Sequence, residues 1–289
     1  MRTRLPDWLT FRRFAATTTG LTLTLMMLGV YTAATGSGLA CSAQWPLCDN
    51  GLLPQSIPSF IEWFHRLVAM VTGFFILGTA AWAWRRDDRR VRLASTLAVV
   101  LLPLQISIGA VTVTLNGALP SGYSVPTHAA HLFTAVSIFG ALTLATLWAS
   151  EGSYRRPPRE RARSALLASL GVVAVSALFS RVTFVLPYDP GTQAAFTGVT
   201  LALVGALLAA TLWLSRAGTP GLAALAGGAL ALSVLVLALG RDMVIYTGTV
   251  RLLNGAAFLL AVVLVGVAAW TLSRRDAPAT PPTEPATPD

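Results

Sequence analysis

Both cysteines of the chain, one of its three histidines and a glutamate lie within the short segment of residues 39–69. Cys41 and Cys48 can be joined as a disulfide or cycle as a pair of thiols. Glu62 and His65, three positions apart, share one face of any helix that contains both. A carboxylate can accept or donate a proton, and an imidazole can do the same or bind a metal. The segment therefore concentrates residue types suited to acid–base, redox or metal chemistry.

The other two histidines, His128 and His131, open the apolar segment "VPTHAAHLFTAVSIFGAL". If two helices start at Phe60 and Pro126, His65 and His131 each lie five residues in, or about 7.5 Å at ~1.5 Å per residue. Two helices that run in the same direction could present these imidazoles to opposite faces of one planar metal macrocycle, as haem is held in helix bundles. His65 and His131 are therefore the predicted axial ligands of a haem iron.

Three polar residues near these histidines allow two interpretations each. Glu62 belongs with His65 to a functional site inside the membrane, or the two form an interfacial pair that reaches water. His128, one turn nearer the surface than His131, could contact a haem propionate or have no role. Arg66 could likewise contact a propionate or reach the lipid headgroups.

The composition requires these residues to be placed by membrane helices. Hydrophobic residues make up 54% of the chain and charged residues 11%, and the mean hydropathy is +0.66. Such values are far from those of a soluble domain. Eight apolar runs are each long enough to cross a ~30 Å hydrocarbon layer as a helix. The predicted spans are residues 14–36, 60–83, 93–115, 126–149, 164–186, 193–214, 221–240 and 245–272.

The arginines are distributed unevenly between the predicted loops. The chain has no lysine, and all 21 basic residues except Arg66, Arg181, Arg241 and Arg251 flank one side of the spans. Because positively charged loops stay cytoplasmic, both termini are predicted to be cytoplasmic in a prokaryotic plasma membrane. The net charge of +9 then reflects topology. The short basic runs lack interleaved aromatic residues, so they do not predict nucleic-acid binding.

The first outer loop, residues 37–59, carries both cysteines and neither lysine nor arginine. On the outer side an oxidising compartment would allow Cys41 and Cys48 to persist as a disulfide. This bond could simply stiffen the loop, or the two thiols could cycle during turnover. The turn-forming residues Pro46, Gly51 and Pro54 favour a loop folded against the membrane surface, as a lid over the residues below.

Three of these features together resemble the haem A synthase family, which takes part in the assembly of haem–copper cytochrome oxidases. They are "CSAQWPLC" in the first outer loop, "EWFHRLVA" at the start of the second span and "HLFTA" at the start of the fourth. The resemblance covers the first four spans.

This resemblance implies oxidation of the C8 methyl group of haem O to the formyl group of haem A, by successive hydroxylations with oxygen from water. His65 and His131 would ligate the iron of the substrate haem and fix its rotation. Glu62 would stabilise positive charge at the reacting carbon or take a proton from the attacking water. Cys41 and Cys48 would hold the lid or take part in electron or haem transfer.

The second half of the chain departs from the family pattern. Family members with eight spans usually carry a second histidine pair for a haem b cofactor, but no histidine follows His131 here. A cofactor haem b in this half is therefore doubtful, and would need a ligand such as Met243, Tyr246 or Asn254. The predicted organisation is a catalytic four-helix half at residues 1–150, a pseudo-repeated four-helix scaffold at 151–275 and a disordered proline-rich tail at 276–289.

Other functions remain open on the same residues. A membrane b-type cytochrome would also use paired histidines, but it usually holds haems at two depths and has no need of Glu62. A haem-binding oxidase-assembly protein without catalysis would need the histidines alone. A transporter is suggested only by the eight spans and their internal repeat. The expected partners are haem O as substrate, the lipid bilayer, the haem O synthase and oxidase assembly factors.

Overall fold

The computed structural model describes residue 6 and residues 8–41, 44–118, 124–241 and 245–274. Within these ranges the chain forms eight α-helices, two short 3₁₀ helices and no β-strand. All eight α-helices are long and apolar enough to cross a membrane. The predicted all-α membrane fold is therefore confirmed. The helices are α1 (Phe11–Ala34), α2 (Ile57–Ala83), α3 (Arg89–Ala118), α4 (Val125–Ala149), α5 (Pro158–Phe179), α6 (Pro190–Arg216), α7 (Pro220–Gly240) and α8 (Gly248–Arg274).

Prolines and capping side chains set many of the helix starts. Five helices (α2, α4, α5, α6 and α7) carry a proline in their first two positions, where its missing N–H breaks no helical hydrogen bond. Ser56 caps α2 by accepting from the Ser59 amide, and Asp189 caps α6 by accepting from the Thr192 amide. Seven of the eight helices therefore begin earlier than the predicted apolar runs, because hydropathy does not register caps, whereas α8 begins at Gly248, after the start of its run.

The predicted fifth span was wrong at its outer end. It was placed at 164–186, but α5 ends at Phe179. Ser180 turns its hydroxyl back to the Ala177 carbonyl, and Phe184 has a positive φ of 54° that no helix accepts. The residues after Phe179 are apolar enough to continue the run, so hydropathy alone could not show this stop.

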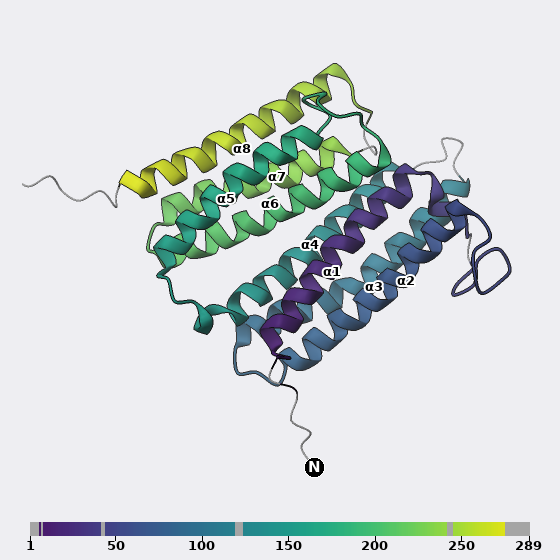
Figure 1. Ribbon diagram of the computed structural model, residues 1–289, viewed down its shortest axis with the longest axis horizontal. Helices are drawn as coiled ribbons and strands as arrows, with labels where there is room; N and C mark the ends of the chain where they lie inside the picture. Colours follow the sequence, from purple (N-terminus) through teal and green to yellow (C-terminus); the bar gives the residue numbers. More distant parts are fainter. Residues whose placement is uncertain (1–5, 7, 42–43, 119–123, 242–244, 275–289) are drawn as a thin grey trace, which may run out of the picture.

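The helices form two rings of four, shown by the two groups in Figure 1. In α1–α4 each helix packs against the next and α4 returns to α1, and α5–α8 repeats this order. Two buried hydroxyl pairs occupy equivalent interfaces. Thr18 and Thr79 join α1 to α2 at 2.8 Å, and Ser176 and Thr200 join α5 to α6 at 2.7 Å. These contacts support the pseudo-repeat.

Helix α6 joins the two rings because it packs against α1 and α4 as well as α5 and α7. The largest group of buried apolar side chains surrounds it, whereas α3 lies at the edge and is almost wholly uncovered. An apolar, uncovered face of this kind suits lipid. The boundaries of the two halves at 1–150 and 151–275 stay a prediction, and the tail at 276–289 lies outside the described residues.

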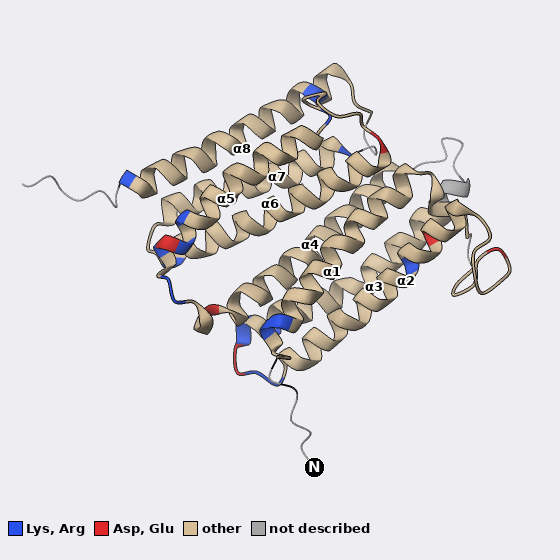
Figure 2. Ribbon diagram, viewed as in Figure 1, with Lys and Arg blue, Asp and Glu red and all other residues tan. Residues whose placement is uncertain are grey.

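Charged residues gather at one end of the molecule, where α1, α3, α5 and α7 begin (Figure 2). There Arg90 contacts Asp88 at 3.2 Å and Glu151 at 3.1 Å, and Arg216 contacts Glu151 at 2.5 Å. Partial burial would raise the pKa of Asp88, but the hydrogen bonds and charge of Arg90 lower it overall. This network ties the α2–α3 turn to the segment between the two rings.

Candidate functional site

A folded loop covers the start of α2 at the opposite end of the molecule from the charged network. Cys41 and Cys48 form the predicted disulfide with their Cα atoms 4.8 Å apart, and both are buried. Asp49 accepts hydrogen bonds from the Ser59 hydroxyl at 2.9 Å and from the Gln55 amide at 2.8 Å. The loop is therefore fixed to α2 by polar contacts as well as by its own covalent bond.

Glu62 is the buried centre of this attachment. Only 2% of the residue is exposed. One carboxylate oxygen accepts the backbone N–H of Cys41 at 2.6 Å, and the other accepts from the Arg66 guanidinium, one turn along α2. Arg66 also donates to the Gln44 carbonyl at 2.8 Å. The pair thus links α2 to Cys41 of the disulfide and to Gln44, which lies within the segment that the disulfide closes.

His65 lies on α2 one turn from Glu62, and its ring rests against α1. A Cβ atom added to Gly29 of α1 would lie 3.1 Å from His65 Cε1, closer than ordinary van der Waals contact. His131 of α4 lies in the same way against α3, where a Cβ at Gly109 would be 3.1 Å from its Cε1. Each imidazole therefore packs so closely against a glycine of the facing helix that an added methyl group would require the ring to shift.

The two glycines were missed by sequence reasoning. Glycine is common in membrane helices as a packing residue, so neither Gly29 nor Gly109 stood out among the 24 glycines. The signal that could have found them is their position: each glycine lies on the helix that precedes a histidine-bearing helix, near the same end.

The ring nitrogens of both histidines are incompletely bonded. The Nδ1 atoms of His65 and His131 are buried and have no hydrogen-bond partner among the described residues. Gln105 of α3 places its amide nitrogen 3.1 Å from His131 Nε2. Because an amide N–H only donates, His131 Nε2 accepts, and in the neutral ring the hydrogen is then on Nδ1. Gln105 is a further site residue that the sequence did not indicate.

The predicted equal depth of the histidines needs a correction. Because α2 begins at Ile57 and α4 at Val125, His65 is the ninth residue of its helix and His131 the seventh. Counted from the helix starts, they differ by two residues, or about 3 Å along the axis. The imidazoles of His65 and His131 still lie close enough for a charge on one to affect the other.

His128 and Arg241 lie near His131. The His128 Nδ1–H donates to the Ser124 carbonyl at 2.9 Å, and the half-buried ring lies one turn from His131. Arg241 follows α7, in the second ring, and its charge acts on both His128 and His131. The site at α2 and α4 is therefore reached by a cation from the other half of the molecule.

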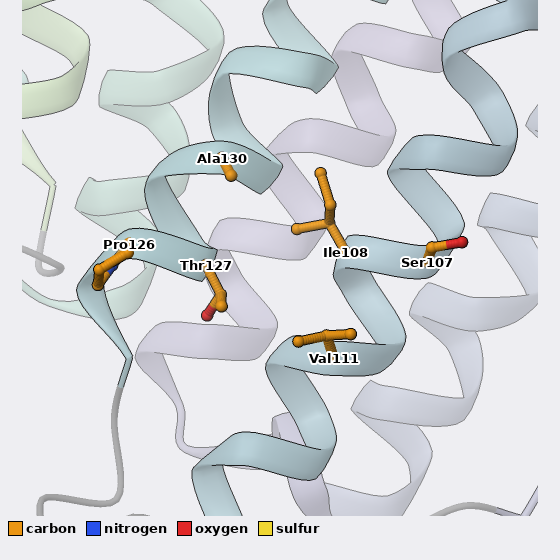
Figure 3. Close-up of a pocket in the computed structure, with 6 residues that line it drawn as sticks. All are labelled: Ser107, Ile108, Val111, Pro126, Thr127 and Ala130. Atoms are coloured by element: carbon orange, nitrogen blue, oxygen red, sulfur yellow. The ribbon is translucent and has the colours of Figure 1, made fainter.

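A small apolar pocket of about 270 Å³ lies between α3 and α4, near His131 in the sequence (Figure 3). Its lining consists of Ser107, Ile108, Val111, Pro126, Thr127 and Ala130. In Figure 3 Ile108 and Val111 of α3 lie opposite Thr127 and Ala130 of α4. The pocket supplies no charged group.

The second ring offers no comparable pair of imidazoles, because it has no histidine. Asn254 is fully buried and donates to the Tyr246 hydroxyl at 3.2 Å. These two side chains, which a haem b in this half would need as ligands in place of histidine, therefore contact each other, and Met243 lies outside the described residues. Among the described residues there is also no group of three or more His, Cys, Asp or Glu side chains that could hold a metal ion.

Comparison with known proteins gives a consistent set of relatives. A family model described as cytochrome oxidase assembly protein matches residues 55–182. A heme A synthase of Shouchella clausii is 30% identical over 255 residues, which cover 86% of this chain and 80% of that protein. A heme A synthase of Bacillus licheniformis is 33% identical over 135 residues, and a protoheme IX farnesyltransferase of Halobacterium salinarum is 40% identical over 126 residues. The chain spans 45% and 27% of the lengths of these last two relatives.

Proposed function

Because the chain belongs to the haem A synthase family, we propose that it oxidises the C8 methyl group of haem O to the formyl group of haem A in the membrane. The observation that carries this proposal is the pair of imidazoles, each set against a glycine of the neighbouring helix and lying at the end of the bundle covered by the disulfide loop. Each hydroxylation replaces a C–H bond by a C–O bond to water oxygen and releases protons and an electron pair to an acceptor. The resulting diol loses water to give the formyl group.

His65 and His131 are the proposed ligands of the iron of haem O. The close packing of both imidazoles against glycines, together with the electron pair on His131 Nε2, fits a pair of nitrogens that could hold an iron. Gln105 favours the His131 tautomer whose Nε2 has a free electron pair, and it would rotate away when that nitrogen binds iron. Bonds from both imidazoles would hold the macrocycle between α2 and α4, and contacts to its propionates would set which methyl group is presented to the reacting position.

Glu62 is the proposed group that accepts a proton from the attacking water or stabilises charge on the reacting carbon. It lies one turn from His65 and is buried, so water does not screen its charge. Its bonds to Cys41 and Arg66 hold the carboxylate in one place. Arg66, His128 and Arg241 are cationic or hydrogen-bonding groups near the two histidines, and they are the proposed contacts of the haem propionates.

The test is conversion in membranes. The chain is expressed with a source of haem O, and the extracted haems are separated by chromatography and weighed by mass spectrometry. We expect haem A in these membranes and only haem O in matched membranes that lack the chain. Haem O as the sole product in both would contradict the proposal.

A second function is favoured by one observation, the absence of histidine from residues 151–289. A chain with one histidine pair could bind haem and assist oxidase assembly without catalysis. In the conversion test this protein would copurify with haem O and form no haem A.

The arginine distribution and the relatives of the chain support proposals about its location and its partners. Both termini are proposed to lie in the cytoplasm of a plasma-membrane protein, because arginine-rich loops stay cytoplasmic. Relatives named protoheme IX farnesyltransferase contain a segment similar to this chain, so the enzyme that makes haem O is a proposed partner. Oxidase assembly factors are the proposed partners that receive the product, haem A.

A further inference from the structure

A second and larger cavity lies in the ring without histidines, at the same end of the molecule as the disulfide loop. Its volume is about 730 Å³, within the ~300–1,000 Å³ range of ligand sites. The α5–α6 loop, the start of α6 and the start of α8 form its walls. It is therefore distinct from the site between α2 and α4.

Among the described residues that line this cavity, the charged ones are both positive. They are Arg181 and Arg251, and none of the described lining residues is an aspartate or glutamate. The remaining polar lining is supplied by hydroxyls and an amide, among them Tyr188, Tyr246 and Gln193. Such a wall favours an anion with several oxygen atoms.

Aromatic rings hold both guanidinium groups in place. The Arg181 guanidinium carbon lies 4.2 Å from the centre of the Tyr246 ring and 4.7 Å from that of Tyr188. The Arg251 guanidinium lies 3.7 Å from the centre of the Phe184 ring and donates to the Val182 carbonyl at 3.4 Å. Cations positioned before a ligand arrives lose less conformational entropy when they bind it.

The surroundings of the cavity indicate that its ligand is a membrane amphiphile. It lies where the helices end, which is the depth of the headgroups for spans of this length. Phe184 and Val185, on the loop that forms the wall, are 66% and 59% exposed. Exposed apolar side chains beside fixed cations match an acyl chain beside a phosphate, because the cations suit the phosphate oxygens and the apolar side chains suit the chain.

We propose that this cavity binds the phosphate group of an anionic phospholipid, with Arg181 and Arg251 as the groups that contact the phosphate oxygens. The lipid would fill the space between the α5–α6 loop and α8 and fix the second ring at the membrane surface. This proposal does not depend on the chemistry assigned to His65 and His131.

The experiment measures lipid retained by the purified full chain. The protein is placed in nanodiscs with equal amounts of phosphatidylglycerol and phosphatidylcholine, released in the mass spectrometer, and its bound lipids are counted. We expect retained phosphatidylglycerol in the unmodified chain and about tenfold less after Arg181→Gln with Arg251→Gln, because charge-assisted hydrogen bonds contribute on that scale. Arg181→Lys with Arg251→Lys keeps the charge and should retain part of the binding.

The matched control is Arg274→Gln. Arg274 also lies on α8 and also covers an aromatic ring, Trp270, at 4.1 Å, but it lies at the other end of the helix. This variant should retain the lipid at the level of the unmodified chain. Equal retention of the two lipids, or unchanged retention in the double glutamine variant, would overturn the proposal.

Two further arms separate the lipid from other anions. If inorganic phosphate alone displaces the phosphatidylglycerol at millimolar concentration, the cavity binds a free ion and the lipid assignment is wrong. If haem remains after His65→Ala with His131→Ala and is lost when Arg181 and Arg251 are also replaced, the cavity binds porphyrin carboxylates, and the lipid assignment is again wrong. Neither result is expected.

Discussion

At the scale of single residues, Glu62 has a proposed role in the chemistry and an observed role in holding the loop. Its spacing from His65 predicted a role in the chemistry, and the structure adds bonds to Cys41 and Arg66. Contacts across 21 residues of chain, such as the one between Glu62 and Cys41, have no periodic signal in a single sequence. Replacing Glu62 by glutamine and by alanine distinguishes the role in the chemistry from the role in holding the loop.

We expect Glu62→Gln to form little or no haem A and to lose only part of the stability, because its amide oxygen can accept one of the two hydrogen bonds of Glu62, while its NH2 group can neither accept the other nor take a proton. Glu62→Ala should lose activity and stability together, since it leaves partly buried Arg66 without its carboxylate, at a cost on the order of 2 kcal/mol. Haem analysis and thermal unfolding measure the two effects. Full haem A formation by Glu62→Gln would remove Glu62 from the proton chemistry.

The glycines facing the histidines allow a second prediction at this scale. Gly29→Ala and Gly109→Ala each place a methyl group 3.1 Å from an imidazole carbon and so displace the ring. The ring would have to move by a few tenths of an ångström, and a misplacement of ~1 Å at a reacting group can cost about 100-fold in rate. We expect haem A formation to fall several-fold in each variant, with a changed spectrum of the bound haem.

Gly20→Ala is the control for this experiment, because Gly20 lies on α1 and a Cβ there meets nothing within 4 Å. It should leave haem binding and activity unchanged and add slightly to helix stability. If Gly29→Ala and Gly109→Ala show the haem spectrum of the unmodified protein, the positions of the two imidazoles do not depend on these glycines.

At the scale of elements, the histidine-bearing helices and the disulfide loop could be predicted, but their exact placement could not. Hydropathy located α2 and α4 to within a few residues, and the Cys41–Cys48 pair was confirmed. The end of α5 was missed because Ser180 and Phe184 stop the helix through backbone geometry inside an apolar run. The contacts of Asp49 could not be predicted from the sequence either, since they depend on how the loop folds back on α2.

The loop gives a prediction about the disulfide. Cys41 and Cys48 are 2% and 0% exposed, and the loop is also held by Glu62 and Asp49. We therefore expect neither cysteine to react with a thiol reagent in native membranes until a reductant is added. Efficient labelling of both without reduction would contradict a persistent disulfide.

Serine variants separate a stiffening role from a redox role. If the bond only stiffens the loop, Cys41→Ser with Cys48→Ser should keep part of the haem A formation and lower the unfolding temperature. We expect this result because the polar contacts of Glu62 and Asp49 remain in the variant. Complete loss of haem A formation with bound haem O intact would instead indicate thiol cycling.

At the scale of the whole molecule, the pseudo-repeat is conserved in packing but not in chemistry. Both rings have the same helix order and a hydroxyl pair in the same interface, yet the second ring has no histidine. The sequence predicted this asymmetry from composition alone. It did not predict that Arg241 of the second half would act on His128 and His131, because that depends on the packing of α6 against α1 and α4.

The uneven distribution of arginines gives a prediction about orientation. We expect a fluorescent reporter fused after residue 289 to be active and an alkaline phosphatase fusion at the same place to be inactive, because the basic end of the bundle should stay cytoplasmic. The reverse pattern would place the disulfide loop in the cytoplasm, where such a bond is rarely stable.

The central claim is that one haem, the substrate or its product, is held by His65 and His131. The most direct measurement is the amount and identity of haem in the purified chain, compared between the unmodified protein, His65→Ala, His131→Ala and the control Tyr246→Phe. We expect about one haem per chain, haem O or haem A, with a low-spin spectrum that either histidine variant loses and the control keeps. A haem b that remains at one per chain after both histidines are replaced would contradict the claim.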